Sequence, residues 1–162
     1  MSTQVKKGAA DWEMAGDSLQ TILFRMGDEF YGLPIEAIKE IIKPLPVTRF
    51  PRSPQYVEGI IDLRNKILPI INLRKLFGLE SIPLTEESRF IDIHMEGMQV
   101  GIVVDAVSEV VRIPVSQVEA APALIAGVDG KYLYGVARLQ DRLILLLDLN
   151  ATLASIQPGT AQ

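Results

Sequence analysis

A histidine and a neighbouring aspartate are the side chains of this chain that come nearest to acid–base or metal-binding chemistry. His94 is the one histidine among the 162 residues, and strand alternation places it on the same face as Asp92, opposite Ile91 and Ile93. A carboxylate beside an imidazole can move a proton or bind a metal, but one histidine rarely makes a complete site. We therefore expect Asp92 and His94 to lie on a solvent-exposed strand face that has no catalytic or metal-binding role.

Two glutamates at matching positions offer a second arrangement that could do chemistry. Glu40 and Glu109 lie at the same place in two similar segments and could face each other as a carboxylate pair. Nothing else in the sequence supplies a nucleophile or orients a substrate, and there is no cysteine and no glycine-rich phosphate-binding motif. We expect structural or interface carboxylates, in a protein that is not an enzyme and uses neither a cofactor nor a metal.

The matching segments belong to an internal repeat. Residues Gly32–Ile42 resemble Gly101–Val111 at a spacing of 69, and Gly59–Leu68 resemble Gly135–Ile144 at a spacing of 76. A repeat bears on the whole architecture, because each copy forms a similar structural unit. Two copies predict a pair of small modules related by a pseudo-two-fold axis, with a groove between them that can hold a partner.

Composition and charge narrow the class of protein. The chain is 48% hydrophobic and 6% aromatic, which predicts an aliphatic core. Its net charge is −4, with +3 on residues 20–79 and −6 on residues 80–155; this is either scatter over solvated faces or a module with opposite-sign ends. The negative charge disfavours binding to nucleic acid. No signal peptide is visible and the longest apolar run, Leu143–Leu147, cannot span a bilayer, so we expect a cytoplasmic protein without direct membrane insertion.

Short strands and frequent turn signals predict an all-β fold of small barrels. The strongest hairpin joins Tyr56–Arg64 to Ile67–Leu73 with Asn65-Lys66 at the turn, since asparagine tolerates positive φ. The repeat places Asp141-Arg142 at the equivalent turn. The other expected elements are strands at Thr21–Met26, Glu29–Leu33, Arg89–Met95, Gln99–Val104, Val107–Ile113, Tyr134–Gln140 and Leu143–Leu149, and short helices at Pro34–Glu40 (with Lys39–Ile42 as an alternative strand), Leu73–Phe77 and Asp148–Ala154.

Both ends of the chain lack a sustained hydrophobic period. Residues 1–18 predict a flexible N-terminal tail, in which Trp12 is either incidental or docked on the body. Residues 156–162 predict a flexible C-terminal tail.

Several of these runs, taken together, resemble the CheW family of chemotaxis coupling proteins. The resemblance extends over residues 19–153 and rests on Gly59–Arg74, Glu40-Ile41, Val47–Pro51 and Gly101–Asp105. It implies a domain at 19–155 made of two SH3-like five-stranded barrels about a pseudo-two-fold axis, which agrees with the repeat. We place subdomain 1 at about 19–83 and subdomain 2 at about 84–155, with strands exchanged between them as an alternative.

The resemblance also implies a function. It indicates a non-enzymatic adaptor that couples the hairpin tips of chemoreceptors to a CheA-type histidine kinase, with one barrel pairing with a barrel of the kinase regulatory domain. Such a protein would be cytoplasmic and recruited to receptor arrays at the membrane. It could instead serve a chemosensory-like pathway that controls surface motility or another output, and it could bind a second copy of itself weakly. A nucleic-acid-binding small barrel is the distant alternative.

Five positions match places where the family binds receptor: Ile38, Glu40, Arg64, Gly101 and Val110. We expect Arg64 to be exposed beside a turn and to reach a carboxylate or a helix carbonyl, and Gly101 to let a partner backbone approach. From residue type alone, Ile38 and Val110 fit a core equally well, and Glu40 with Arg64 could be an ordinary surface ion pair. Asp62 stands where the family usually has asparagine, and we expect its charge to weaken the contact of Arg64.

Overall fold

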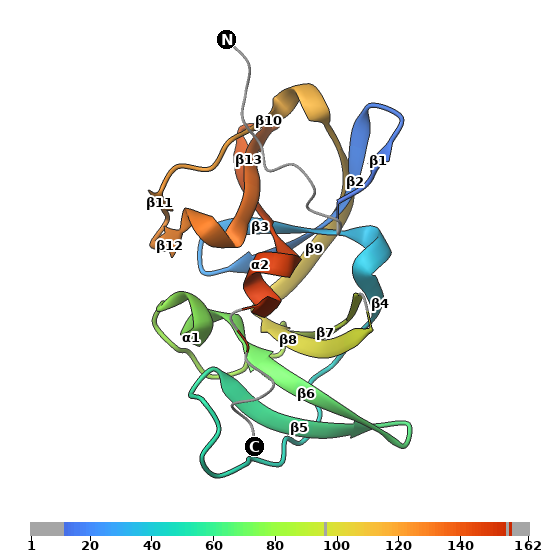
Figure 1. The fold of residues 1–162 in the computed structure, drawn as a ribbon, viewed down its shortest axis with the longest axis vertical. Helices are drawn as coiled ribbons and strands as arrows, with labels where there is room; N and C mark the ends of the chain where they lie inside the picture. The colour runs from blue at the N-terminus through green and yellow to red at the C-terminus, as the bar shows by residue number, and fades with distance from the viewer. Residues whose placement is uncertain (1–11, 96, 155, 157–162) are drawn as a thin grey trace.

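The structure, a computed structural model, describes residues 12–95, 97–154 and 156, which form two β-sheets stacked along the long axis of the molecule (Figure 1). The five-stranded sheet has the order β4 (Ile38–Ile42), β7 (Arg89–Met95), β8 (Met98–Val104), β6 (Lys66–Asn72) and β5 (Val57–Leu63). The seven-stranded sheet has the order β1 (Met14–Ala15), β2 (Ser18–Met26), β3 (Glu29–Pro34), β14 (Arg142–Leu147), β13 (Leu133–Leu139) and β10 (Val118–Glu119), with β9 (Ala106–Pro114) paired to β2. The remaining elements are η1 (Ile35–Ala37), α1 (Leu73–Phe77), η2 (Val115–Gln117), the pair β11 (Leu124–Ile125) and β12 (Val128–Asp129), η3 (Gly130–Tyr132) and α2 (Leu149–Ala154).

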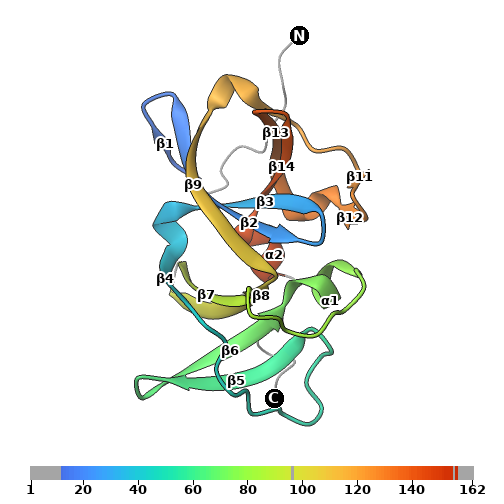
Figure 2. The ribbon, with the colours of Figure 1, turned by 180° about the vertical axis from the view of Figure 1, so that it is seen from behind.

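The two sheets divide the chain unequally. We name residues 38–104 the first barrel and residues 12–37 with 105–154 the second barrel, after the sheets to which their strands belong. The boundary expected near residue 83 lies inside the first barrel, because β7 and β8 pair with β4 and β6. Seen from behind, β9 runs from the outer end of the second barrel to its junction with the first (Figure 2). Strands β2 and β3, from the first half of the chain, thus belong to the second barrel, and β7 and β8, from the second half, belong to the first.

The pairing within each sheet confirms two related barrels. Parallel strands β3 and β14 place Gly32 opposite Leu146, and parallel strands β8 and β6 place Gly101 opposite Ile70. These pairs correspond to each other through the two repeat spacings of 69 and 76. The architecture is that of two small β-barrels, as predicted.

The two long hairpins turn one residue earlier than predicted. In the first barrel Leu63 pairs with Lys66, and the two residues between them, Arg64 and Asn65, have φ of 53° and 68°. Two positive φ values are the pattern of a type I′ turn, whose twist matches that of the strands it joins. The equivalent residues of the second barrel, Gln140 and Asp141, have φ of 52° and 65°. The asparagine is part of the turn as expected, but at its second position.

A continuous core joins the barrels. Helix α1 is as predicted and ends at Gly78, which has φ of 78°; its Phe77 ring lies 4.9 Å from the ring of Tyr132 and 6.3 Å from that of Tyr31, both of the second barrel. The cluster around these rings takes residues from both sheets. The relative position of the barrels is therefore fixed by buried apolar contacts.

Within the predicted N-terminal tail, Trp12 is docked on the second barrel and Met14–Ala15 pair with β2. Trp12 is 7% exposed, its indole N–H donates to the carbonyl oxygen of Leu147 at 2.6 Å, and its ring stacks on Tyr134. Residues 1–11 and 157–162 lie outside the described residues. Within the described part of the chain, none of the helices is long and apolar enough to cross a membrane.

The predicted helix at Pro34–Glu40 is shorter than expected. Only Ile35–Ala37 is helical, as a 3₁₀ turn, and β4 begins at Ile38. The alternative strand at Lys39–Ile42 is thus the correct one, because its backbone pairs with β7. This pairing places Glu40 on a sheet.

Candidate functional site

Arg64 and Glu40 form the centre of the candidate site. Nη2 of Arg64 donates to Oε1 of Glu40 at 2.8 Å, and Nη1 donates to Oε2, so the contact is bidentate. The hydrogen bond from Arg64, assisted by its charge, lowers the pKa of Glu40, and the same pair raises the pKa of Arg64. The Arg64 side chain is 69% exposed and that of Glu40 is 22% exposed. The expected surface ion pair is present, with the guanidinium available to a partner.

The hairpin turn places Arg64 beside Glu40. Arg64 is the first residue of the turn, and Oδ1 of Asp62 accepts a hydrogen bond from the backbone N–H of Asn65 at 3.0 Å. Asp62 therefore stabilises the turn. The carboxylates that raise the pKa of Arg64 are Glu40, first through its hydrogen bond, and then Asp92, so the neutralising role expected of Asp62 belongs to Glu40.

Asp92 is buried, contrary to the exposed face predicted for it. It is 1% exposed and lies on the side of β7 that carries Phe90, where the apolar side chains of the first barrel pack together. The amide nitrogen of Gln99 donates to its two oxygens at 3.2 and 3.3 Å, and Nε2 of His94 lies 3.5 Å from its Oδ1. Alternation gave the correct face for Asp92 and His94, but it could not show that the sheet curls over that face.

Gly101 is enclosed by side chains of its own barrel. It lies in β8 between β7 and β6, and a Cβ at this position would be 2.7 Å from Cδ1 of Ile70 and 3.2 Å from Cδ2 of Leu68. Glycine is required here because side chains of the same barrel fill the space. The close approach is made by the protein's own core rather than by a partner backbone.

The two aliphatic candidates differ in exposure. Val110 in β9 is 58% exposed and so is a surface residue, whereas Ile38 at the start of β4 is partly buried against the shared core. Glu40 and Gly101 share a row of the first sheet, since each is directly opposite Asp92 on one of its two sides. Among the five candidates, the described contacts join Glu40 to Arg64 and leave Val110 on the other sheet.

The family model of the CheW-like domain matches residues 20–157, which includes both barrels and every candidate residue. The chain belongs to the CheW family. Among its relatives, the "Chemotaxis protein CheW" of Treponema pallidum is 34% identical over 143 residues, covering 86% of this chain and 84% of the relative. The protein of the same name from Helicobacter pylori is 34% identical over 129 residues, covering 80% and 78%. The crystal structure of the scaffolding protein TtCheW from Thermoanaerobacter tengcongensis superposes with a TM-score of 0.75 at 34% identity, covering 80% of this chain and 88% of that one.

In this CheW-family chain, the second barrel has an ion pair of its own, in which the glutamate is the repeat counterpart of Glu40 but the arginine, Arg142, is the counterpart of Lys66 and not of Arg64. Nη1 of Arg142 lies 2.8 Å from Oε2 of Glu109, and the Arg142 guanidinium lies over the Phe30 ring, 5.1 Å from its centroid. Glu109 is the repeat counterpart of Glu40. The two glutamates thus pair with arginines of their own barrels and do not form the carboxylate pair considered from the sequence. The repeat itself was the signal that could have found Arg142, since it directs attention to the matching hairpin.

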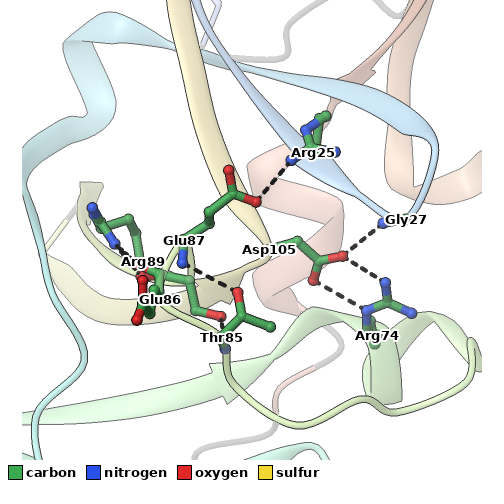
Figure 3. A network of polar contacts seen from close by, with 9 residues as sticks. Arg25, Gly27, Arg74, Thr85, Glu86, Glu87, Arg89 and Asp105 are labelled. Carbon is green, nitrogen blue, oxygen red and sulfur yellow. Dashed lines mark hydrogen bonds and ion pairs between the residues drawn. The ribbon is translucent and has the colours of Figure 1, made fainter.

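A second polar cluster, not predicted from the sequence, ties the barrels of the CheW fold together at Asp105 (Figure 3). Nε and Nη2 of Arg74 donate to Asp105 at 3.2 and 2.6 Å, and the Gly27 backbone N–H donates to its Oδ2 at 2.7 Å. Partial burial by itself would raise the pKa of Asp105, but these hydrogen bonds and the nearby positive charges together lower it. Arg25 and Glu87 add a longer contact of 3.4 Å beside it. Arg74 and Asp105 both lie in sequence runs that resemble the family, and this resemblance could have pointed to the cluster before the structure was known.

Proposed function

We propose that this protein is a non-enzymatic adaptor that couples the cytoplasmic hairpin tips of chemoreceptors to a CheA-type histidine kinase. The observation that carries the proposal is the match of the CheW-like domain to residues 20–157, together with relatives that are named chemotaxis protein CheW over most of their length. The solved relative is described as a scaffolding protein. The adaptor would act in the cytoplasm, at receptor arrays.

The surface of the molecule supports contacts with other proteins. Large apolar side chains are exposed on both barrels, Phe50 and Leu84 on the first, Val110 and Leu124 on the second. Val110 follows Glu109, which pairs with Arg142; at protein interfaces, apolar groups of this kind supply affinity and charged groups fix the register. The regulatory domain of the kinase would pair barrel to barrel with this chain.

We place the receptor contact at Ile38, Glu40, Arg64 and Val110. The geometry in support is the exposed guanidinium of Arg64, held on Glu40 at the tip of a hairpin. Gly101 would contribute by shaping the sheet two strands away from Glu40 in the same row, because any side chain there would displace Ile70 and Leu68.

The test is a calorimetric titration with a receptor hairpin tip and, separately, with the kinase regulatory domain. Arg64→Glu should abolish receptor binding and keep the urea unfolding midpoint, because an exposed turn residue contributes little to stability. Arg142→Glu is the matched control, since Arg142 pairs with the repeat counterpart of Glu40. Failure of the wild-type protein to bind either partner would refute the proposal. Binding of both partners in a cell whose swimming chemotaxis does not need the protein would assign it to a chemosensory-like pathway with another output.

A further inference from the structure

The N-terminal segment and the loop between α1 and β7 are counterparts in the internal repeat. The spacing of 69 that relates the two copies extends back over β2 and β7, because every residue pair of β2 and β3 has its counterpart in β7 and β8 at that spacing. Continuing back along the chain, the counterpart of Trp12 is Ser81. A large aromatic residue that packs on the second barrel is thus replaced by a small polar residue on the first.

A cavity in the first barrel matches the place that Trp12 fills in the second. The ring of Trp12 stacks on Tyr134, whose counterpart at the hairpin spacing of 76 is Glu58. Glu58 and Ser81 both line one cavity of about 250 Å³. A cavity of about 150 Å³ already holds a benzene ring, so this one has room for a two-ring group such as indole.

The walls of the cavity are partly apolar, which favours an organic ligand over water alone. Phe90 and Val103 line it from the sheet, and Ile82 and Leu84 line it from the loop. Ile82 and Leu84 are 41% and 54% exposed, so the loop side of the cavity is accessible from solvent. Apolar walls around a few placed polar groups are typical of small-molecule sites.

The charged groups of the cavity wall are already paired. Arg74 holds Asp105, as described above. Nζ of Lys75 lies 3.1 Å from Oε2 of Glu58, and Nδ2 of Asn72 donates to the same oxygen at 2.8 Å. Burial by itself would raise the pKa of Glu58, but these contacts lower it. An ionised ligand would have to break one of these pairs, so an uncharged ligand is favoured, and Oε1 of Glu58 can accept its N–H.

We propose that this cavity binds a small, uncharged aromatic molecule that carries an N–H donor, with the ring between the 81–84 loop and the sheet and the N–H on Oε1 of Glu58. Trp12 is the precedent within the same chain, since its ring is packed and its N–H donates to the carbonyl oxygen of Leu147. None of the five residues matched to receptor binding lines the cavity. The inference therefore stands apart from the proposed adaptor function.

The probe is indole itself, titrated into the full chain and followed by the NMR shifts of the backbone amides. We expect saturable shifts at Ser81 and Ser88, which line the cavity, with a Kd of about 1 mM or tighter for a ligand of this size. Ser81→Trp places an indole ring where the second barrel has Trp12, and should weaken binding of the probe at least about tenfold. Ser108→Trp, at an exposed serine of β9, is the matched control and should bind like the wild type.

Fluorescence tests the equivalence of the two positions directly. In a Trp12→Phe background the introduced tryptophan is the only one in the chain. Its emission should be weakly quenched by acrylamide in Ser81→Trp and strongly quenched in Ser108→Trp. Thermal unfolding checks that each variant is folded, and Val47→Phe, which narrows the cavity from another wall, takes the place of Ser81→Trp if that variant does not fold.

A second probe, 1-methylindole, tests the hydrogen bond because it lacks the N–H. It should bind the wild type about three- to tenfold more weakly than indole. Glu58→Gln should reduce that difference, because a neutral amide oxygen is a weaker acceptor than a carboxylate.

Four results would overturn the inference. The first is the absence of saturable shifts up to about 10 mM indole. The second is a set of shifts centred on Tyr134, because the probe would then compete with Trp12 in the second barrel. The third is unchanged binding in Ser81→Trp or its substitute, or strong quenching of a tryptophan at position 81. The fourth is equal affinity for indole and 1-methylindole, which would remove Glu58 as the acceptor.

Discussion

Replacing Asp105 by asparagine should weaken the junction of the two barrels. Asp105 accepts two hydrogen bonds from Arg74 of the first barrel and one from the Gly27 backbone of the second. Asparagine has nearly the same shape, but it carries no charge and offers only one acceptor oxygen. The side-chain NH2 group of the asparagine must then face one of the N–H donors of Arg74 or Gly27.

The expected loss follows from these contacts. A hydrogen bond to a charged group contributes about 1.5–3 kcal/mol, and because Asp105 is only partly buried the lower end of that range applies. With at least one such bond lost and Arg74 left without its counter-charge, we expect Asp105→Asn to lower the free energy of unfolding by about 2 kcal/mol. For a chain of this size that corresponds to roughly 4–8 °C in Tm. Glu87→Gln is the control, because its contact with Arg25 is long and exposed and should change stability by less than about 0.5 kcal/mol.

The assay is urea unfolding of both variants and the wild type across pH. The pKa of Asp105 is lowered in the folded state, so its stabilisation is fully present above the unfolded value of about 3.9 and is lost as the pH falls through the folded value. The difference between wild type and Asp105→Asn should be constant from neutral pH down to about 5 and shrink below about 4. A variant as stable as the wild type at pH 7, or a difference that grows on acidification, would refute the reasoning.

Three further predictions concern the core and the packed N-terminal segment. Trp12→Ala should lower the free energy of unfolding by about 3 kcal/mol, because it removes a buried ring and leaves the carbonyl of Leu147 without its indole donor. In the wild type, weak quenching of the fluorescence of this single tryptophan by acrylamide would show that the ring is packed, and strong quenching would contradict it. Gly101→Ala should cost about 1–3 kcal/mol by overpacking against Ile70, measured by urea unfolding, and a neutral effect would count against this account of the glycine. Burial raises the pKa of Tyr31 to about 12, so stability should fall as the pH rises above about 10, the pKa of tyrosine in the unfolded chain. If Tyr31→Phe lost stability between about pH 10 and 12 just as the wild type does, ionisation of Tyr31 would not be the cause.

Most of the fold could be predicted from the internal repeat and from the residue patterns of the hairpins. Alternating residues located β2 and β3, and the same reasoning placed α1 at the residues where the structure has it. The sheet to which each strand belongs could not be predicted, because alternation within a strand says nothing about which strand becomes its neighbour. The pairing of Gly32 with Leu146 depends on contacts far apart in the sequence.

The candidate site was predictable in part for the same reason. Arg64 and Glu40 could be named as a possible ion pair, since both match receptor-binding positions of the family and carry opposite charges. The role of Gly101 could not be derived, because a glycine in a strand can make room for a partner or for its own core, and only the positions of Ile70 and Leu68 decide between them. Asp92 was placed on the correct face, but its burial depends on the curl of the whole sheet.

The nesting of one barrel within the other sets an order for folding during synthesis. All strands of the first barrel lie in residues 38–104, so their pairing does not require the C-terminal strands of the second barrel. Strands β2 and β3 are made earlier and pair with each other, yet the second partner of β3 in its sheet is β14, near the C-terminal end. At ordinary translation rates the N-terminal strands must therefore wait several seconds for that partner, with apolar side chains such as Phe24 and Leu33 uncovered. A nascent chain stalled before β13 would display these strands to chaperones, whereas one stalled after α2 would not.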